Sequence, residues 1–233
     1  GLAASGHRTL TLAPEAGSQR LRDVINKGIR EEHLLEGVRL AAQAGIPNLR
    51  LYIMIGLPTE VDEDIDAIAE MALRVLACME EAGSKGKLTL SVNPFIPKPF
   101  TPFQWLPMAD KKVVQQRLRR LESLLKSQRR IEILSEPPRE AYVQAVLARG
   151  DRRLAPVLAA AAAKGGWRRF TACLKDAGLD EESYLYRQRS IDERLPWAHL
   201  DMGFNKDYLW QEWQRAVKEA PTKGCFPGCR RCG

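Results

Sequence analysis

Two short turns carry polar residues directly after predicted strands, where parallel α/β sheets bind their ligands. The first turn, residues 14–18 (PEAGS), follows the alternating segment 8–13 and precedes a predicted helix at 19–27. The Glu15 carboxylate can accept hydrogen bonds from the hydroxyl or ammonium groups of a ligand. Ser18 suits a ligand contact and a helix N-cap equally well. The spacing alone leaves ligand binding and capping open.

The second turn, residues 56–60 (GLPTE), follows the apolar run 49–55. Gly56 permits close approach of a ligand to the backbone, and the helix that follows would favour an anion at its N-terminus. Thr59 is also a candidate cap, and Glu60 a candidate partner of the helix dipole. For this motif alone we favour the capping interpretation.

A stiff, apolar segment follows the third predicted strand. Residues 93–105 (NPFIPKPFTPFQW) contain four aromatic residues and four prolines, so the segment must pack on something. Two interpretations remain open: a lid over the open end of the sheet, or a wall of a substrate cavity.

The elements that would position these turns alternate between strands and helices up to residue 136 and are helical afterwards. This order predicts an α/β fold with a parallel sheet, followed by an all-helical extension. We expect three parts, at residues 1–136, 137–221 and 222–233. The predicted strands are 8–13, 49–55, 87–93 and 130–135; the helices are 19–27, 31–44, 62–82 and 109–128, then 139–149, 155–163, 167–177 and 206–220.

Composition limits the class of protein. The chain has 233 residues and a formal net charge of +7, with ordinary globular proportions that exclude wholesale disorder and a collagen-like fibre. No apolar run reaches the roughly 18 residues that a membrane helix needs, so we expect no membrane partner. The positive charge favours an acidic partner such as RNA.

Three of the five cysteines lie close together near the end of the sequence. Cys225, Cys229 and Cys232 have Cys-x3-Cys-x2-Cys spacing and basic neighbours, which predicts a soft-metal site that holds an iron–sulfur cluster or zinc. The alternative is a tail with free thiols. Cys78 and Cys173 stand on apolar helix faces and are expected in the core. The cysteines form no disulfide framework, which favours a reducing cytoplasm.

Together the motifs resemble those of a known family. The segments LTLAPEAGSQRLRDVINKGI, GIPNLRLYIMIGLPTE and NPFIPKPFTPFQW are similar to successive strand-end motifs of the radical S-adenosylmethionine (radical SAM) superfamily, in the branch of methylthiotransferases and cobalamin-binding-domain proteins. Residues 148–153, 184–187 and 195–197 and the terminal cysteines resemble one uncharacterised group in it, which carries an N-terminal cobalamin-type domain.

The resemblance implies the late strands and helices of a partial (β/α)6 radical SAM barrel, with S-adenosylmethionine across the carboxyl ends of its strands. By motif position, Glu15 and Ser18 would contact the ribose or methionine part, and Lys27 would lie near the methionine carboxylate. Gly56 would belong to the adenine motif. Phe95, Ile96 and Pro97 would form a wall against the adenine.

The chain departs from the family pattern at the cluster loop. Such enzymes hold a 4Fe-4S cluster on a Cys-x3-Cys-x2-Cys loop after the first barrel strand, but no cysteine precedes Cys78. We therefore expect the C-terminal part of a longer parent enzyme, inactive alone, with the main cluster ligands outside this chain. Cobalamin would sit on the missing N-terminal domain. The reaction would be radical chemistry, methyl transfer or methylthio transfer, and the terminal cysteines would hold an auxiliary site.

A competing hypothesis makes the protein a non-enzymatic, basic RNA-binding module with a terminal zinc or iron–sulfur knuckle. It rests on the basic residues of 111–130, which could face RNA or tRNA. The other interpretation of the same segment is a solvated outer helix of the barrel.

Overall fold

The computed structural model describes residues 2–232, and the chain divides into two compact units. The first unit comprises residues 1–94, 111–136 and 215–222, and the second comprises 95–110, 137–214 and 223–233. The proline-rich segment therefore belongs to the second unit, together with the helical residues that follow the sheet.

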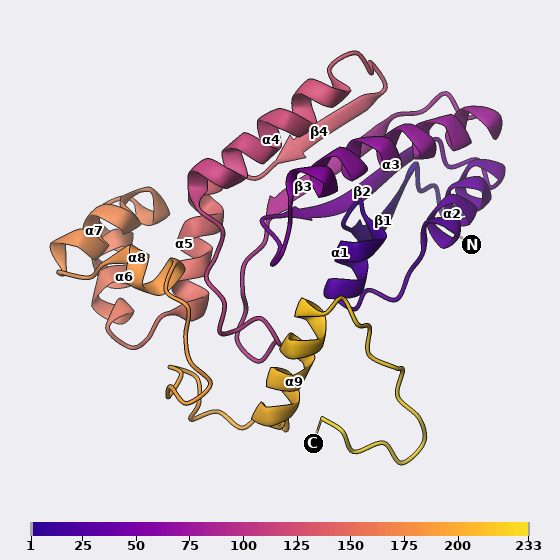
Figure 1. Cartoon of the computed structure of the whole chain (residues 1–233). Coiled ribbons are helices and arrows are strands. Elements are labelled where there is room, and N and C mark those ends of the chain that lie inside the picture. Colours follow the sequence, from indigo (N-terminus) through magenta and orange to yellow (C-terminus); the bar gives the residue numbers. More distant parts are fainter. Residues whose placement is uncertain (1, 233) are drawn as a thin grey trace. The chain divides into compact units, whose positions relative to one another are not determined.

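The first unit is built on a four-stranded parallel sheet in the order β1-β2-β3-β4 (Figure 1). Helices α3 and α4 pack side by side over the sheet. This arrangement confirms the predicted parallel α/β fold, because each crossover places a helix on the sheet between consecutive strands. The elements are β1 Thr9–Glu15, α1 Gln19–Val24, α2 Glu31–Gln43, β2 Asn48–Ile55, α3 Asp62–Glu81, β3 Leu88–Pro94, α4 Lys111–Leu125 and β4 Ile131–Ser135.

Burial alternates along the central strand β2. Leu49, Leu51 and Ile53 are buried, whereas Arg50 is half-buried and Tyr52 is 41% exposed. Side chains of a strand point alternately to the two faces, so helices cover one face and the other is more open within this unit. An apolar run such as 49–55 is typical of a strand of a parallel sheet that helices cover on at least one side, and β2 has one such side.

Strand β1 is longer than the sequence predicts. It continues through Pro14 and ends at Glu15, with an irregular register between Leu12 and Glu15 against β2. The expectation that Pro14 ends the strand is wrong. β1 is an edge strand, where a residue without an N–H group is tolerated because one side has no ladder partner.

The second unit is helical, as predicted for the extension. Its core joins Ile96 of the proline-rich segment and Met108, which follows that segment, to apolar residues of the helices. The short helix α8 was not predicted; Asp180 caps it by accepting from the amides of Glu182 and Ser183. The elements are α5 Pro138–Arg149, α6 Leu154–Ala163, the 3-10 helix η1 Gly166–Arg169, α7 Phe170–Asp176 and α8 Glu181–Leu185; α9 Lys206–Val217 contributes residues to both units.

Among the described residues, no helix is both long enough and apolar enough to cross a membrane.

Candidate functional site

Glu15 occupies a strained position at the carboxyl end of β1. Its φ of 66° lies in the left-handed region, which a residue with a Cβ adopts only when its surroundings hold it there. The Lys27 ammonium lies 3.3 Å from the Glu15 carboxylate, and both side chains are partly exposed. The structure thus brings together two predicted site residues, as an anion and a cation at one strand end.

Ser18 is the N-cap of α1, which confirms the capping interpretation. Its hydroxyl oxygen accepts a hydrogen bond from the Leu21 amide at 3.2 Å, and the hydroxyl donates to Asp64 Oδ1 at 2.6 Å. Asp64 also pairs with Arg20. Because the Ser18 hydroxyl donates its hydrogen bond to Asp64, a ligand at Ser18 would meet only an acceptor. The ligand contact of Ser18 stays a prediction.

The turn after β2 is held by a buried carboxylate. Gly56 has φ 81°, and its amide donates to Glu60 Oε1 at 2.8 Å, while the Leu57 amide donates to Oε2 at 3.4 Å. Arg117 Nη1 lies 2.7 Å from Glu60 Oε1. Burial raises the pKa of Glu60 to about 7, and the two amides and Arg117 oppose that rise. Glu60 therefore fixes the backbone of the predicted adenine motif.

Thr59 does not cap the next helix, so that interpretation is wrong. Val61 is the N-cap of α3, and its amide donates to Asp64 Oδ2 at 2.9 Å. Thr59 instead has φ 64° and accepts from Arg20 through its carbonyl oxygen at 2.8 Å. Arg20 and Asp64 thereby tie the two strand-end turns to each other.

The more open face of the sheet contains a buried donor that sequence reasoning did not single out. Arg50, on β2, has a buried Nε atom without a hydrogen-bond partner among the described residues. Arg50 lies opposite Thr11, near the amino end of β2, whereas Glu15 lies opposite Ile53. The strand ends of the first unit therefore offer carboxylate chemistry at Glu15 and cationic chemistry at Lys27. This donor set fits the groups of S-adenosylmethionine, which has ribose hydroxyls, an ammonium and a carboxylate.

The predicted adenine wall lies in the second unit. Phe95 packs edge-on against Phe103, with ring centroids 5.6 Å apart, and Ile96 is 9% exposed in the helical core. Pro97 is buried beside it in the sequence. The structure does not bring these residues together with Gly56 in one compact unit, and their contact with adenine stays a prediction.

The terminal cysteines are accessible. Cys225 is exposed, and Cys229 and Cys232 are partly buried. Within residues 2–232, no group of three or more His, Cys, Asp or Glu side chains is placed to hold a metal ion. A hydrogen bond from Arg231 lowers the pKa of the Cys229 thiol. Metal binding by the three stays a prediction, whereas Cys78 and Cys173 are buried as expected.

Several arginines of segment 111–130 pair with acids of the first unit. Arg117 pairs with Glu60, Arg120 donates to both carboxylate oxygens of Asp66 at 2.6 Å, and Arg130 pairs with Glu80. These contacts support the interpretation of α4 as an outer helix of the sheet layer.

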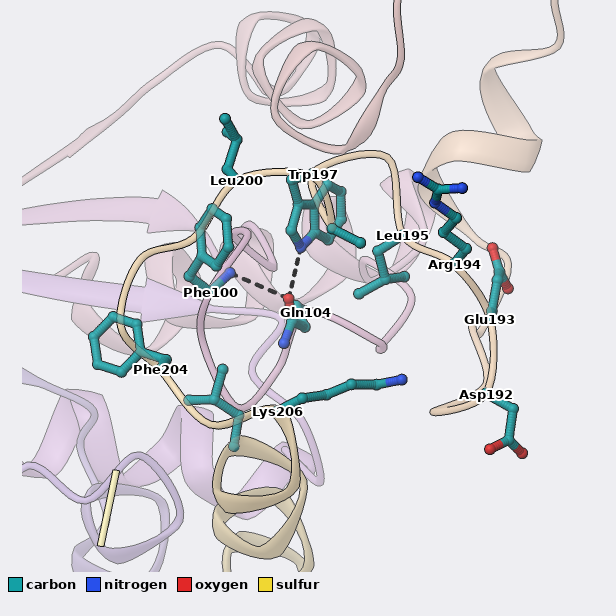
Figure 2. Close-up of a pocket in the computed structure, with 12 residues that line it drawn as sticks. Phe100, Gln104, Asp192, Glu193, Arg194, Leu195, Trp197, Leu200, Phe204 and Lys206 are labelled. Carbon is teal, nitrogen blue, oxygen red and sulfur yellow. Dashed lines mark hydrogen bonds between the residues drawn. The ribbon is translucent and has the colours of Figure 1, made fainter. Parts of the chain in front are cut away.

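The second unit contains a cavity that sequence reasoning did not identify. It measures about 360 Å³ (Figure 2). Phe100 and Gln104 of the proline-rich segment line it together with residues of 192–209. The two interpretations of that segment, a lid over the sheet and a wall of a substrate cavity, both stay predictions. The signal available in the sequence was the aromatic density of residues 93–105.

A comparison with known protein families gives a match within the first unit. Residues 1–72 match the family model of the radical SAM superfamily. This radical SAM match contains β1, β2 and the turns that carry Glu15, Ser18, Lys27 and Gly56. The sheet with its helices and the helical extension agrees with part of a radical SAM (β/α) barrel.

A curated relative covers most of the chain. The uncharacterized protein MJ0966 of Methanocaldococcus jannaschii is 36% identical over 195 residues, which are 83% of this chain and 40% of that protein. The chain thus spans about two fifths of the length of this relative. No solved structure matches the chain.

Proposed function

We propose that this chain supplies the S-adenosylmethionine-binding strand ends of a radical SAM enzyme. The observation that carries the proposal is Glu15 at the carboxyl end of β1, within the radical SAM match. Its backbone is strained, and its carboxylate pairs with Lys27. Strain of this kind persists where the surrounding structure and function hold it. The 4Fe-4S ligands lie outside these 233 residues in this proposal, because no cysteine precedes Cys78.

Each residue has a role that follows from its chemistry. Glu15 accepts hydrogen bonds from the ribose hydroxyls or the methionine ammonium, and Lys27 donates to the methionine carboxylate. The cluster, when bound, supplies the electron for reductive cleavage of S-adenosylmethionine.

The Gly56 turn recognises the adenine through its backbone. Glu60 occupies the Gly56 and Leu57 amides, so the adenine would meet the carbonyl edge of the turn and the surface that Gly56 leaves free of a Cβ. The turn is rigid before the ligand arrives, because the Glu60 carboxylate is held by Arg117 as well. Rigidity of this kind lowers the entropic cost of binding.

The remaining parts of the proposal concern the longer protein. Cobalamin would belong to a domain outside this chain, and Cys225, Cys229 and Cys232 would hold an auxiliary iron–sulfur cluster or zinc in the cytoplasm. The lowered pKa of Cys229 supports the metal site, because metals bind the thiolate. Elemental analysis of the longer protein tests it: Cys229→Ser must reduce bound metal, and Cys173→Ser must not.

Calorimetric titration with S-adenosylmethionine tests the main proposal in both this chain and the cluster-loaded longer protein. We expect Glu15→Ala to weaken binding about 10- to 150-fold, because a charge-assisted hydrogen bond is lost. Glu36→Ala, which removes an exposed carboxylate on α2, is the matched control and must leave binding unchanged. Equal affinity of the wild type and Glu15→Ala would refute the proposal.

A further inference from the structure

The cavity in the second unit has aromatic walls and an exposed apolar margin. Phe100 and Trp197 line it, and Phe204 is 49% exposed at its edge (Figure 2). Leu200, which also lines the cavity, is 52% exposed. Large apolar side chains that gather in the open around a cavity mark a place where another molecule binds.

A buried amide gives this cavity a fixed donor. The Gln104 side chain is nearly inaccessible, and its Oε1 accepts from Trp197 Nε1 at 2.7 Å and from the Phe100 amide at 3.2 Å. Because both contacts come from donors, the oxygen is identified and the Nε2 group must donate. Figure 2 shows Nε2 turned away from Trp197 and toward the side of the cavity that Lys206 lines.

The Gln104 Nε2 group has no hydrogen-bond partner among the described residues, although its oxygen has two. Nε2 is not one of the buried atoms that lack a partner, so it is accessible from the cavity. A ligand that presents an oxygen or an unprotonated nitrogen can accept from Gln104, whereas a purely aliphatic ligand would cover this donor without pairing it, which costs free energy.

The rim of the cavity carries charges of both signs. Lys206 and Arg194 line it and form no ion pair within the described part of the chain. Of the two acids at the rim, Glu193 pairs with Arg187 at 2.6 Å, and Asp192 is exposed. Either cation could thus receive a phosphate that lies outside the cavity while a ring lies inside.

We propose that this cavity binds a nucleobase. A flat heteroaromatic ring would stack on the aromatic walls at Phe100 and Phe204, and an acceptor on its edge would take the Gln104 Nε2 hydrogen bond. Its phosphate would reach Lys206 or Arg194. The ring comes either from a free nucleotide or from an unpaired base of single-stranded RNA, which offer the same chemistry to these residues.

The test uses pyrimidine probes, because S-adenosylmethionine carries an adenine that could bind elsewhere in the protein. The 233-residue chain is titrated calorimetrically with CMP, UMP and ribose 5-phosphate, and by fluorescence anisotropy with a short, labelled, single-stranded RNA of mixed sequence. The compared proteins are the wild type, Gln104→Glu, Phe204→Ala and Leu158→Ala. Near-ultraviolet circular dichroism checks that each variant keeps its packing.

Two variants test the hydrogen bond of Gln104 and the stacking on Phe204 separately. Gln104→Glu keeps the oxygen that Trp197 and Phe100 need and replaces the donor by an acceptor, so binding should fall about tenfold or more. Phe204→Ala should weaken binding about 5- to 150-fold through lost stacking. Leu158 on α6 is 44% exposed outside the cavity, and Leu158→Ala should bind like the wild type.

The probes also separate the source of the base. Binding of the nucleotides alone identifies a free nucleotide, and binding of the RNA alone identifies an RNA base; either result supports the proposal when Phe204→Ala weakens it. Binding of ribose 5-phosphate as tight as that of CMP would overturn the proposal, because the base would then contribute nothing. Absence of binding by every probe, or equal binding by Phe204→Ala, would overturn it too. Neither result depends on Glu15, so this proposal and the radical SAM proposal can fail separately.

Discussion

The two compact units differ in how completely their polar side chains are paired. At the strand ends of the first unit the predicted motif residues largely satisfy one another: Glu15 pairs with Lys27, Ser18 with Asp64, and Glu60 with two amides and Arg117. In the second unit, Gln104 Nε2 has no hydrogen-bond partner among the described residues and faces a cavity. The strand-end motifs are thus held by contacts within the protein, whereas in our proposal a ligand completes the hydrogen bonds of Gln104.

Buried arginines extend the contrast. In the first unit, buried Arg22 donates to the carbonyl oxygens of Ala16 and Gly17, and none of its buried nitrogen atoms lacks a partner. In the second unit, fully buried Arg149 donates to the carbonyl oxygens of Tyr184 and Gln104, and its Nη2 has no partner among the described residues. Burial lowers the pKa of Arg149 to about 10. Arg189, also buried, has two nitrogen atoms without partners among the described residues. The second unit thus contains more buried donors without an acceptor among the described residues than the first unit does.

The largest expected effect on stability lies in the first unit. Glu60→Ala leaves Arg117 and two amides without their partner, which should lower the free energy of unfolding by about 3–5 kcal/mol. Urea unfolding followed by circular dichroism measures it. Glu63→Ala, which removes an exposed carboxylate on the helix α3 that follows this turn, should change it by less than about 0.5 kcal/mol. Equal losses in the two variants would show that Glu60 does not hold the turn.

A glycine of the first turn gives the next largest effect. A Cβ on Gly17 would lie 2.2 Å from the Ile68 amide nitrogen of α3, so Gly17→Ala should destabilise the protein by about 1–3 kcal/mol. Gly37 on α2 has only ordinary contacts for a Cβ, and Gly37→Ala should stabilise by about 0.5–1 kcal/mol. The midpoints of urea unfolding measure the opposite changes in stability of the two variants. A Gly17→Ala variant as stable as the wild type would contradict the close packing of Gly17 against Ile68.

The smallest expected stability effect is in the cavity. Phe204 is half-exposed, so Phe204→Ala should change the free energy of unfolding by less than about 0.5 kcal/mol while it weakens nucleotide binding. The same urea titration measures it. A loss of about 2 kcal/mol or more would assign Phe204 to packing and remove the contrast between the units.

Local patterns were sufficient to predict the sheet and part of the first site. Alternation and apolar runs predicted all four strands, and the N-cap role of Ser18 was one of two interpretations weighed. The wrong assignment of Thr59 has a physical reason: its positive φ and its contact with Arg20 depend on a residue far away in the sequence. No local pattern reports such contacts.

The cavity could not be predicted from the sequence, because it too depends on contacts between residues that are far apart in the chain. Gln104 and Trp197 are separated by 93 residues, and only the folded chain places the indole where it fixes the amide. The aromatic segment 93–105 predicted that something must pack there. It could not show that the packing partner is the segment around Trp197.

The most direct test of the central claim is an NMR titration of the isotopically labelled chain with S-adenosylmethionine. We predict that the backbone amide signals of Glu15 and Gly56 shift in a saturable manner in the wild type and that the required concentration rises at least about tenfold in Glu15→Ala. Glu36→Ala should behave like the wild type. Saturable shifts that leave the Glu15 and Gly56 amides unmoved, or shifts that are unaffected by Glu15→Ala, would contradict binding at the strand ends.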